Sequence, residues 1–218
     1  MVDFLFLEIN MHTKNNREKE VKFFISDKQA ILDRLSFVGA ILIKQRVYEN
    51  NLRFDTSDHS LRNQHQVLRL RKDDQIHLTF KDQPDLSAGI ADRRELEITV
   101  NDFDTARSLL EALGYHVFMI YEKYRTTFTL NHCEVVLDEM PFGTFIEIEG
   151  ETLNSIQATA RLLNKDWDKR ISASYLELFQ ILQNNKRTSA QNILFSEFPA
   201  SSFSEKDFKN DPLIDSLV

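Results

Sequence analysis

The stretch EKEVKFFI at residues 18–25 alternates charged and apolar side chains with a period of two. Successive side chains of a strand point to opposite faces, so Glu18, Glu20 and Lys22 would share one face and the apolar residues the other. This pattern predicts an antiparallel strand that packs on one face and carries acids and a base on the other.

The same alternation recurs in seven further segments, near 40–55, 66–72, 75–82, 93–100, 115–130, 133–139 and 144–151. A single such strand is usually part of a sheet with one solvated face. Here, however, the polar faces group bases as Arg-x-Arg and Lys-x-Arg and acids as Glu-x-Glu, whereas a solvated face would contain more Ser, Thr, Asn and Gln. The charged positions are Arg69, Arg71, Lys81, Arg93, Glu95, Glu97, Lys123, Arg125, Glu134, Asp138, Glu147 and Glu149.

Amphipathic helices lie between the strands and supply cover for their apolar faces. A capping-box sequence, Ser26–Gln29, begins the first helix, and Gly39 stops it. The second, Phe103–Leu113, follows Asp102 as N-cap and packs through a stripe that includes Leu113. Two more are predicted near 154–164 and 172–184. We therefore predict an α+β fold, an antiparallel eight-stranded β tunnel that is a closed or nearly closed barrel with helices packed outside.

Charge grouping inside such a tunnel predicts its ligand. Two like charges about 5 Å apart repel by roughly 3 kcal/mol at an effective dielectric near 20, so clustered Lys and Arg need acids or a bound anion. Guanidinium groups suit phosphoryl oxygens. Paired carboxylates attract hard cations such as Mg²⁺ or Mn²⁺. The pattern therefore predicts a polyphosphate that is held partly through metal ions.

In this order, the motifs resemble those of the CYTH superfamily of triphosphate tunnel metalloenzymes, which includes class IV adenylyl cyclases, thiamine triphosphatases and inorganic triphosphatases. The signature is Glu18-x-Glu20-x-Lys22. It is followed by Leu-Arg-Leu-Arg at 68–71, Leu-Thr-Phe-Lys at 78–81, Arg-Glu-Leu-Glu at 94–97, Glu-Lys-Tyr-Arg at 122–125, Leu-Asp at 137–138 and Glu-Ile-Glu at 147–149. Ser174-Tyr175 matches the start of the family's last helix, so the resemblance covers about residues 16–182.

The resemblance implies a role for each matched residue. Glu18, Glu20 and Lys22 would be catalytic, and Glu95 and Glu97 would be tunnel acids without an assigned role. The implied triphosphate contacts are Lys22, Arg69, Arg71, Lys81, Lys123 and Arg125. The implied ligands of Mg²⁺ or Mn²⁺ are Glu18, Glu20, Asp138, Glu147 and Glu149.

Three functions fit this lining. The first is metal-dependent hydrolysis of a linear triphosphate, either inorganic or attached to a nucleoside or thiamine. The second is a class IV adenylyl cyclase that converts ATP to cyclic AMP and pyrophosphate. The third is a non-catalytic polyphosphate-binding module, which the loss of a metal-binding acid would favour, but no matched acid is missing. The motif residues do not choose between hydrolysis and cyclisation, because the same ligand set serves both.

The composition of the chain limits the kinds of partner and the cell compartment that are expected. A formal charge of −7 argues against indiscriminate binding of nucleic acid, and the apolar residues 1–10 are too short to span a membrane and carry no export pattern. The single cysteine, Cys133, excludes an intrachain disulfide and favours a cytoplasmic location. The small-molecule triphosphate is the expected partner, and the oligomeric state, monomer or homodimer, stays open.

The chain divides into an extension at 1–15, a tunnel domain at 16–185 and an irregular tail at 186–218. The extension contains Met11, a second possible start. The tail is rich in Ser, Asn, Lys and Asp with isolated Phe residues, which favours a loosely docked terminus over a partner-binding arm or plug. Tyr48, Tyr121 and Tyr124 are expected to pack rather than to stack on a substrate ring. Trp167 is expected to cover the core.

Overall fold

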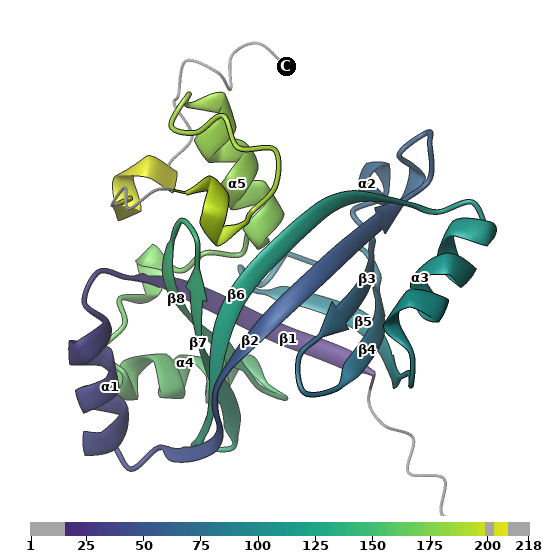
Figure 1. Cartoon of the computed structure of the whole chain (residues 1–218). Coiled ribbons are helices and arrows are strands. Elements are labelled where there is room, and N and C mark those ends of the chain that lie inside the picture. The colour runs from purple at the N-terminus through teal and green to yellow at the C-terminus, as the bar shows by residue number, and fades with distance from the viewer. Residues whose placement is uncertain (1–15, 199–202, 209–218) are drawn as a thin grey trace, which may run out of the picture.

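A computed structural model describes residues 16–198 and 203–208, which form one closed antiparallel barrel with helices on its outside (Figure 1). Its strands are β1 (Arg17–Ile25), β2 (Ile41–Asp55), β3 (Val67–Lys72), β4 (Ile76–Lys81), β5 (Ala91–Thr99), β6 (His116–Leu130), β7 (Cys133–Met140) and β8 (Gly143–Glu149). The order around the barrel is β1-β5-β4-β3-β2-β6-β7-β8. The predicted α+β barrel of eight strands is therefore confirmed.

Strand register brings the charged motifs to the inside of the barrel. Glu20 of β1 lies opposite Glu149 of β8, and Lys22 opposite Glu147. On the other side of β8, Glu149 also lies opposite Glu134 of β7. Because side chains alternate along every strand, one register fixes which residues face the tunnel at all neighbouring positions.

The helices are α1 (Lys28–Phe37), α2 (Ser60–Asn63), α3 (Phe103–Ala112), α4 (Leu153–Leu162) and α5 (Tyr175–Asn184), with short 3₁₀ turns η1 (Trp167–Lys169), η2 (Phe195–Glu197) and η3 (Glu205–Phe208). They are stabilised by side-chain caps. Asp102 accepts the Thr105 N–H, and Ser174 and Glu177 form a capping box at the start of α5. Gly39 and Gly114 have positive φ, as expected where α1 and α3 stop.

The predicted capping box at Ser26–Gln29 is wrong. Asp27 is the N-cap, and its carboxylate accepts the Ala30 N–H at 3.0 Å, while Gln29 donates to Asp33 instead. A carboxylate one residue later accepts from the same free N–H groups. Its negative charge also interacts favourably with the positive end of the helix dipole.

Two other expectations about packing are also wrong. Leu113 is 66% exposed, because α3 ends at Ala112 and the chain turns away at its cap. Leu96 and Ile98 alternate with tunnel acids as predicted, but their side chains are exposed on the outer face of β5. The described helices leave that part of β5 uncovered, since α3 packs on the side of β3.

Three apolar clusters fill the space between barrel and helices. One lies under α1 and α4, where Trp167 packs against Phe23 at a ring-centroid distance of 6.3 Å, as its expected role as core cover requires. A second joins α5 to the C-terminal residues, and a third lies under α3. The barrel interior is thus left to charged side chains.

The described part of the tail packs against the barrel. Ile193 pairs in parallel with Tyr121 on β6, where its N–H donates to the Ile120 carbonyl at 3.0 Å and its carbonyl accepts the Glu122 N–H at 2.9 Å. Ile193 is 1% exposed, and Phe198 and Phe208 are buried in the cluster of α5. This attachment is closer than the loose docking that we expected. The residues of the extension at 1–15 lie outside the described part.

Within the described residues, every helix is too short or too polar to cross a membrane.

Candidate functional site: a charged tunnel

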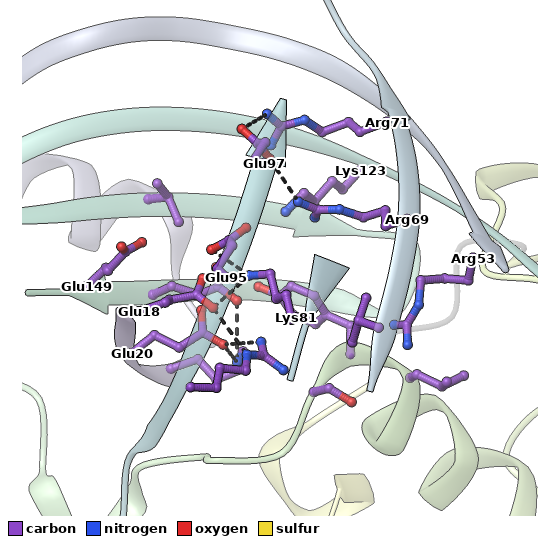
Figure 2. A pocket seen from close by; sticks show the side chains of 18 of the residues that line it. Glu18, Glu20, Arg53, Arg69, Arg71, Lys81, Glu95, Glu97, Lys123 and Glu149 are labelled. Carbon is purple, nitrogen blue, oxygen red and sulfur yellow. Dashed lines mark hydrogen bonds and ion pairs between the residues drawn. The ribbon is translucent and has the colours of Figure 1, made fainter. Parts of the chain in front are cut away.

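A cavity of about 500 Å³ occupies the inside of the barrel, a volume typical of small-molecule sites. All eight strands and the start of α5 contribute side chains to its wall (Figure 2). The predicted site residues that line it are Glu18, Glu20, Lys22, Arg69, Arg71, Lys81, Glu95, Glu97, Lys123, Arg125, Glu147 and Glu149. Asp138 lies behind this wall.

Acids and bases of β1, β4 and β5 pair tightly. The Lys81 ammonium donates to both carboxylate oxygens of Glu18 at 2.6 and 2.7 Å. Arg93 donates to Glu18 at 3.2 Å and to Glu20 at 3.4 Å. Arg93 has no place in the implied phosphate-binding set, although it shares the charged face of its strand with Glu95. These pairs hold the charges of the tunnel in place without a ligand.

Asp138 organises the bases of β6. It is fully buried and accepts from Arg125 at 2.7 and 2.5 Å, from Lys123 at 2.9 Å and from the Tyr175 hydroxyl at 2.9 Å. Burial and the nearby carboxylates of Asp138 and Glu147 raise the pKa of Tyr175, so this hydroxyl stays a donor. The role of Asp138 as a metal ligand stays a prediction, because both its oxygens bond to these donors.

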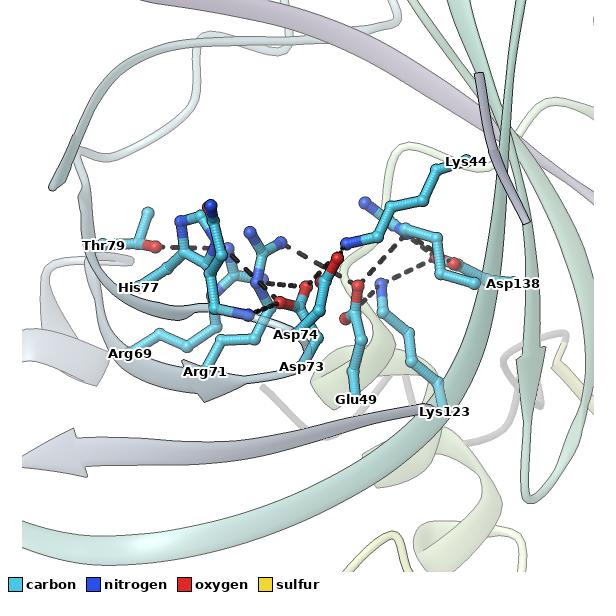
Figure 3. Close-up of polar contacts among 12 residues, drawn as sticks. Lys44, Glu49, Arg69, Arg71, Asp73, Asp74, His77, Thr79, Lys123 and Asp138 are labelled. Atoms are coloured by element: carbon cyan, nitrogen blue, oxygen red, sulfur yellow. Dashed lines mark hydrogen bonds and ion pairs between the residues drawn. The ribbon is translucent and has the colours of Figure 1, made fainter. Parts of the chain in front are cut away.

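Glu49 of β2 is an acid that the motifs did not single out (Figure 3). It is 1% exposed and lies 3.6 Å from Lys123 and 3.9 Å from both Arg71 and Arg125. Burial alone would raise the pKa of Glu49, but these bases lower it to about 2. The period-two alternation of Glu49, Asn51 and Arg53 in the segment 40–55 is the signal that marks it as tunnel-facing.

Glu97 occupies the end of the tunnel near the β3–β4 hairpin. It accepts the Thr79 hydroxyl at 2.8 Å and lies 3.0 Å from His77 and 3.7 Å from both Arg69 and Arg71. Burial would raise the pKa of Glu97, yet the Thr79 hydrogen bond and the two arginines lower it. Glu97 therefore stays ionised and holds the arginines at this end.

Residues 16–172 match the family model of the CYTH domain. The chain belongs to the CYTH family. A protein of Methanocaldococcus jannaschii named "putative adenylate cyclase" is 26% identical over 172 residues, which cover 74% of this chain and 97% of that protein. Adenylate cyclase CyaB of Aeromonas hydrophila is 28% identical over 142 residues, which cover 64% of this chain and 71% of that protein.

Solved structures share the CYTH fold. A Pyrococcus horikoshii protein superposes with a TM-score of 0.63 at 26% identity, covering 74% of this chain and 98% of its own. A Hippeastrum protein, described as a "putative adenylyl cyclase" with a dominant triphosphatase activity, superposes with a TM-score of 0.58 at 21% identity. That superposition covers 75% of this chain and 95% of the Hippeastrum protein. These comparisons confirm the resemblance on which the motif assignment rests.

Several acidic side chains of the CYTH tunnel lie close to Glu149. This side chain makes no ion pair among the described residues, and Glu20 and Glu134 lie opposite it on the neighbouring strands. Burial, followed by the charges of Glu18 and Glu134, raises the pKa of Glu149 to about 8. A cation at this point would relieve the repulsion, so the donor set suits a hard divalent ion.

The carboxylates of the CYTH tunnel do not converge on one point as they stand. No group of three acids in the described part of the chain is placed to ligate one ion, because Glu18, Glu20 and Glu147 turn toward bases. Glu20, Glu134 and Glu149 have the chemistry to hold such an ion after side-chain rotation. Glu134 was absent from the implied metal ligands, although its alternation with Asp138 marked it as tunnel-facing.

Two of the three tyrosines lie on the outer surface of the CYTH barrel. Tyr48 donates to Glu122 at 2.6 Å, and Arg46 stacks on the Tyr124 ring with its guanidinium carbon 3.4 Å from the centroid. Tyr121 faces the tunnel, where its hydroxyl accepts from Arg69 at 3.3 Å. Of the three, Tyr121 alone lines the cavity.

Proposed function

We propose that this chain is a metal-dependent hydrolase of a linear triphosphate, either inorganic or attached to a nucleoside or thiamine. One observation carries the proposal: the cavity has a basic wall and also Glu134 and Glu149, two acids that make no ion pair among the described residues. A triphosphate bridged to a divalent ion complements both sides at once. Family membership supports the same class of ligand.

The bases would hold the phosphate oxygens. Arg69, Arg71, Lys81, Lys123 and Arg125 point into one cavity and are already fixed by acids, so little reorganisation accompanies binding. Their charges would offset negative charge that develops during transfer of a phosphoryl group to water. The arginines would each donate two parallel hydrogen bonds to one phosphate group.

Glu18, Glu20, Glu147 and Glu149 are the proposed acids for Mg²⁺ or Mn²⁺, with Glu134 as an addition. A bound divalent ion supplies charge neutralisation on the phosphates and polarises an attacking water. Lys22 lies 3.4 Å from both Glu20 and Glu147. Burial would lower the pKa of Lys22, but those two acids raise it, so Lys22 stays charged and would contact a phosphate.

A class IV adenylyl cyclase is the second candidate, because the Methanocaldococcus and Aeromonas relatives are named adenylate cyclases. Against it, Tyr48 and Tyr124 do not line the cavity, so neither ring could stack on an adenine there. The dominant triphosphatase activity of the Hippeastrum protein favours hydrolysis. A binding module without catalysis is the third candidate.

Product analysis separates the three candidates. The protein is incubated with inorganic triphosphate, ATP or thiamine triphosphate in Mg²⁺, Mn²⁺ or EDTA, and the products are identified by ion chromatography. We expect orthophosphate from at least one substrate in either metal and none in EDTA. Cyclic AMP would replace the proposal with the cyclase, and binding without turnover would replace it with the module.

Variants test the location of the site. Glu20→Gln and Arg71→Met should lower kcat/KM at least about a hundredfold, since each removes a charge from the cavity. Glu139→Gln and Arg94→Met are matched controls, because these side chains pair with Arg46 and Asp82 on the outside of the barrel. Unchanged activity in either tunnel variant would show that hydrolysis occurs elsewhere.

A further inference from the structure

Arg53 lies inside the tunnel on β2, between two other strands. It is the cross-strand partner of Arg69 on β3 and of Met119 on β6, and all three side chains line the cavity. Directly opposed residues of an antiparallel pair are about 5 Å apart at Cβ, so two guanidinium groups start from neighbouring points of the wall. Arg53 was absent from the residues that the family motifs implicated.

Arg53 differs from the other bases of the wall in having no acid partner. Arg69 lies 3.7 Å from Glu97, and Arg93 lies 3.2 Å from Glu18. In the part of the chain that the structure describes, Arg53 makes no hydrogen bond or ion pair, and its Nε is buried without a partner. Its guanidinium carbon has one aromatic contact, 5.9 Å from the centroid of the Phe118 ring.

The nearest acid along the strand, Asp55, is committed elsewhere. Its carboxylate accepts the backbone N–H groups of Thr56, Leu61 and Arg62 and holds the start of α2. Burial, with the charges of Arg69 and Arg93, lowers the pKa of Arg53 to about 10 even though Tyr121 and Asp55 raise it. Arg53 thus stays charged at neutral pH without a compensating group.

Arg53 and Glu149 lie at opposite sides of the cavity (Figure 2). Beside Arg53 the wall is formed by Arg69 on β3 and by the apolar side chain of Met119 on β6. An anion that reaches this side would therefore meet Arg53 and Arg69. The two sides of the cavity therefore differ in charge: acids lie at one side, and an arginine without an acid partner lies at the other. A bound phosphate chain would be oriented by this difference.

We propose that Arg53, together with Arg69, forms a phosphate subsite next to the triphosphate-binding bases, so that the tunnel takes a linear phosphate chain of four units in preference to three. The inference rests on the proposed function only in assuming that a phosphate chain enters this cavity. A planar guanidinium fork fits a phosphoryl group, and the neighbouring Arg69 adds a second fork on the same side of the cavity. An organic group at this position would leave Arg53 unpaired.

Calorimetric titration in EDTA tests the subsite without turnover, with inorganic triphosphate, inorganic tetraphosphate and ATP as ligands. We expect the wild type to bind tetraphosphate at least about tenfold more tightly than triphosphate. Arg53→Met should abolish that preference while it changes triphosphate affinity less than about threefold. Arg53→Lys should retain part of the preference. Arg46→Met, on the outer face of the same strand, should leave it intact.

The outcomes are separable from failure of the proposed function. If the wild type binds triphosphate but does not bind tetraphosphate more tightly than triphosphate, the subsite is wrong and the proposed function stands. Equal loss of affinity for all ligands in Arg53→Met, or loss for ATP alone, also overturns it. The variant should fold, because it removes a half-buried charge that has no acid partner, and its melting temperature without ligand should equal or exceed that of the wild type.

Discussion

Asp138 is the residue on which the basic wall depends most. Lys123 and Arg125 both donate to it, and it lies at full burial beneath them. An uncompensated buried charge is more costly than the loss of one exposed pair, so this carboxylate keeps two cations inside the protein before any anion binds.

Asp138→Asn should therefore lower the free energy of unfolding by about 3–5 kcal/mol in EDTA, as measured by urea denaturation. Added triphosphate should restore part of the loss, because phosphate oxygens replace the missing carboxylate. Glu139→Gln changes the next residue, whose partly exposed carboxylate pairs with Arg46 and Lys28 on the other face, and should cost less than about 1 kcal/mol. Similar losses in both variants would contradict this account.

At the scale of elements, the segment from Asn192 to Phe198 adds a short parallel pairing to β6 on the outside of the hairpin contacts. β6 continues past the reach of the β7–β8 hairpin, which pairs only from Tyr124 onward. Ile193 supplies the missing hydrogen bonds to Ile120 and Glu122, and Glu197 accepts the Gln191 and Asn192 N–H groups. The segment lies beyond the residues that match the family model.

Ile193→Ala should destabilise the protein by about 2–4 kcal/mol, because it leaves a cavity in a fully packed position. Phe195→Ala removes a larger side chain from the same segment but at 36% exposure, so we expect a smaller loss. Equilibrium unfolding of both variants, together with hydrogen exchange of the Glu122 amide, measures the effect. Faster exchange of that amide only in Ile193→Ala is the expected result, and equal exchange in both would refute the pairing role.

Period-two alternation predicted all eight strands and the inward direction of the charged motifs, because parity alone determines the face of each side chain. It did not predict which acid meets which base, since that depends on register between strands far apart in the sequence. Glu49 and Arg53 share the tunnel-facing parity of their segment, but they were missed because they lie outside the family motifs. The attachment of the tail was also missed, because isolated Phe and Ile residues among polar ones carry no periodic signal.

For the whole molecule, the buried carboxylates make stability depend on pH. The folded-state pKa of Glu49 is about 2 against an ordinary value of 4.5, because the Lys123, Arg125 and Arg71 charges outweigh burial. The pKa of Glu147 is also lowered, since Lys22 and Arg125 outweigh its burial. A lowered pKa means that the folded state binds fewer protons, so this stability is present above pH 4.5 and is lost as pH falls toward 2.

We expect the free energy of unfolding, measured with urea in EDTA, to fall by several kcal/mol between pH 4.5 and pH 2, since the raised pKa of Glu149 gives the opposite slope only above about pH 4.5. Glu49 alone accounts for about 3 kcal/mol of the whole change down to pH 2, at about 1.4 kcal/mol per pKa unit. Glu49→Gln should be less stable at pH 6 and lose less on acidification. Glu151→Gln, at an exposed position after β8, should keep the wild-type slope. A wild-type slope in Glu49→Gln would mean that Glu49 is not held ionised by these bases.

β1 is the first strand of the barrel to be synthesised, yet its two partners are β5 and β8. The second of these ends at Glu149, more than a hundred residues later. β1 can pair with β5 once residue 99 has emerged from the ribosome, but its other edge stays open until β8 has been made. Closing the barrel then brings Glu149 and Glu147 of β8 opposite Glu20 and Lys22 of β1, so the tunnel has its full lining only when the last strand joins the first.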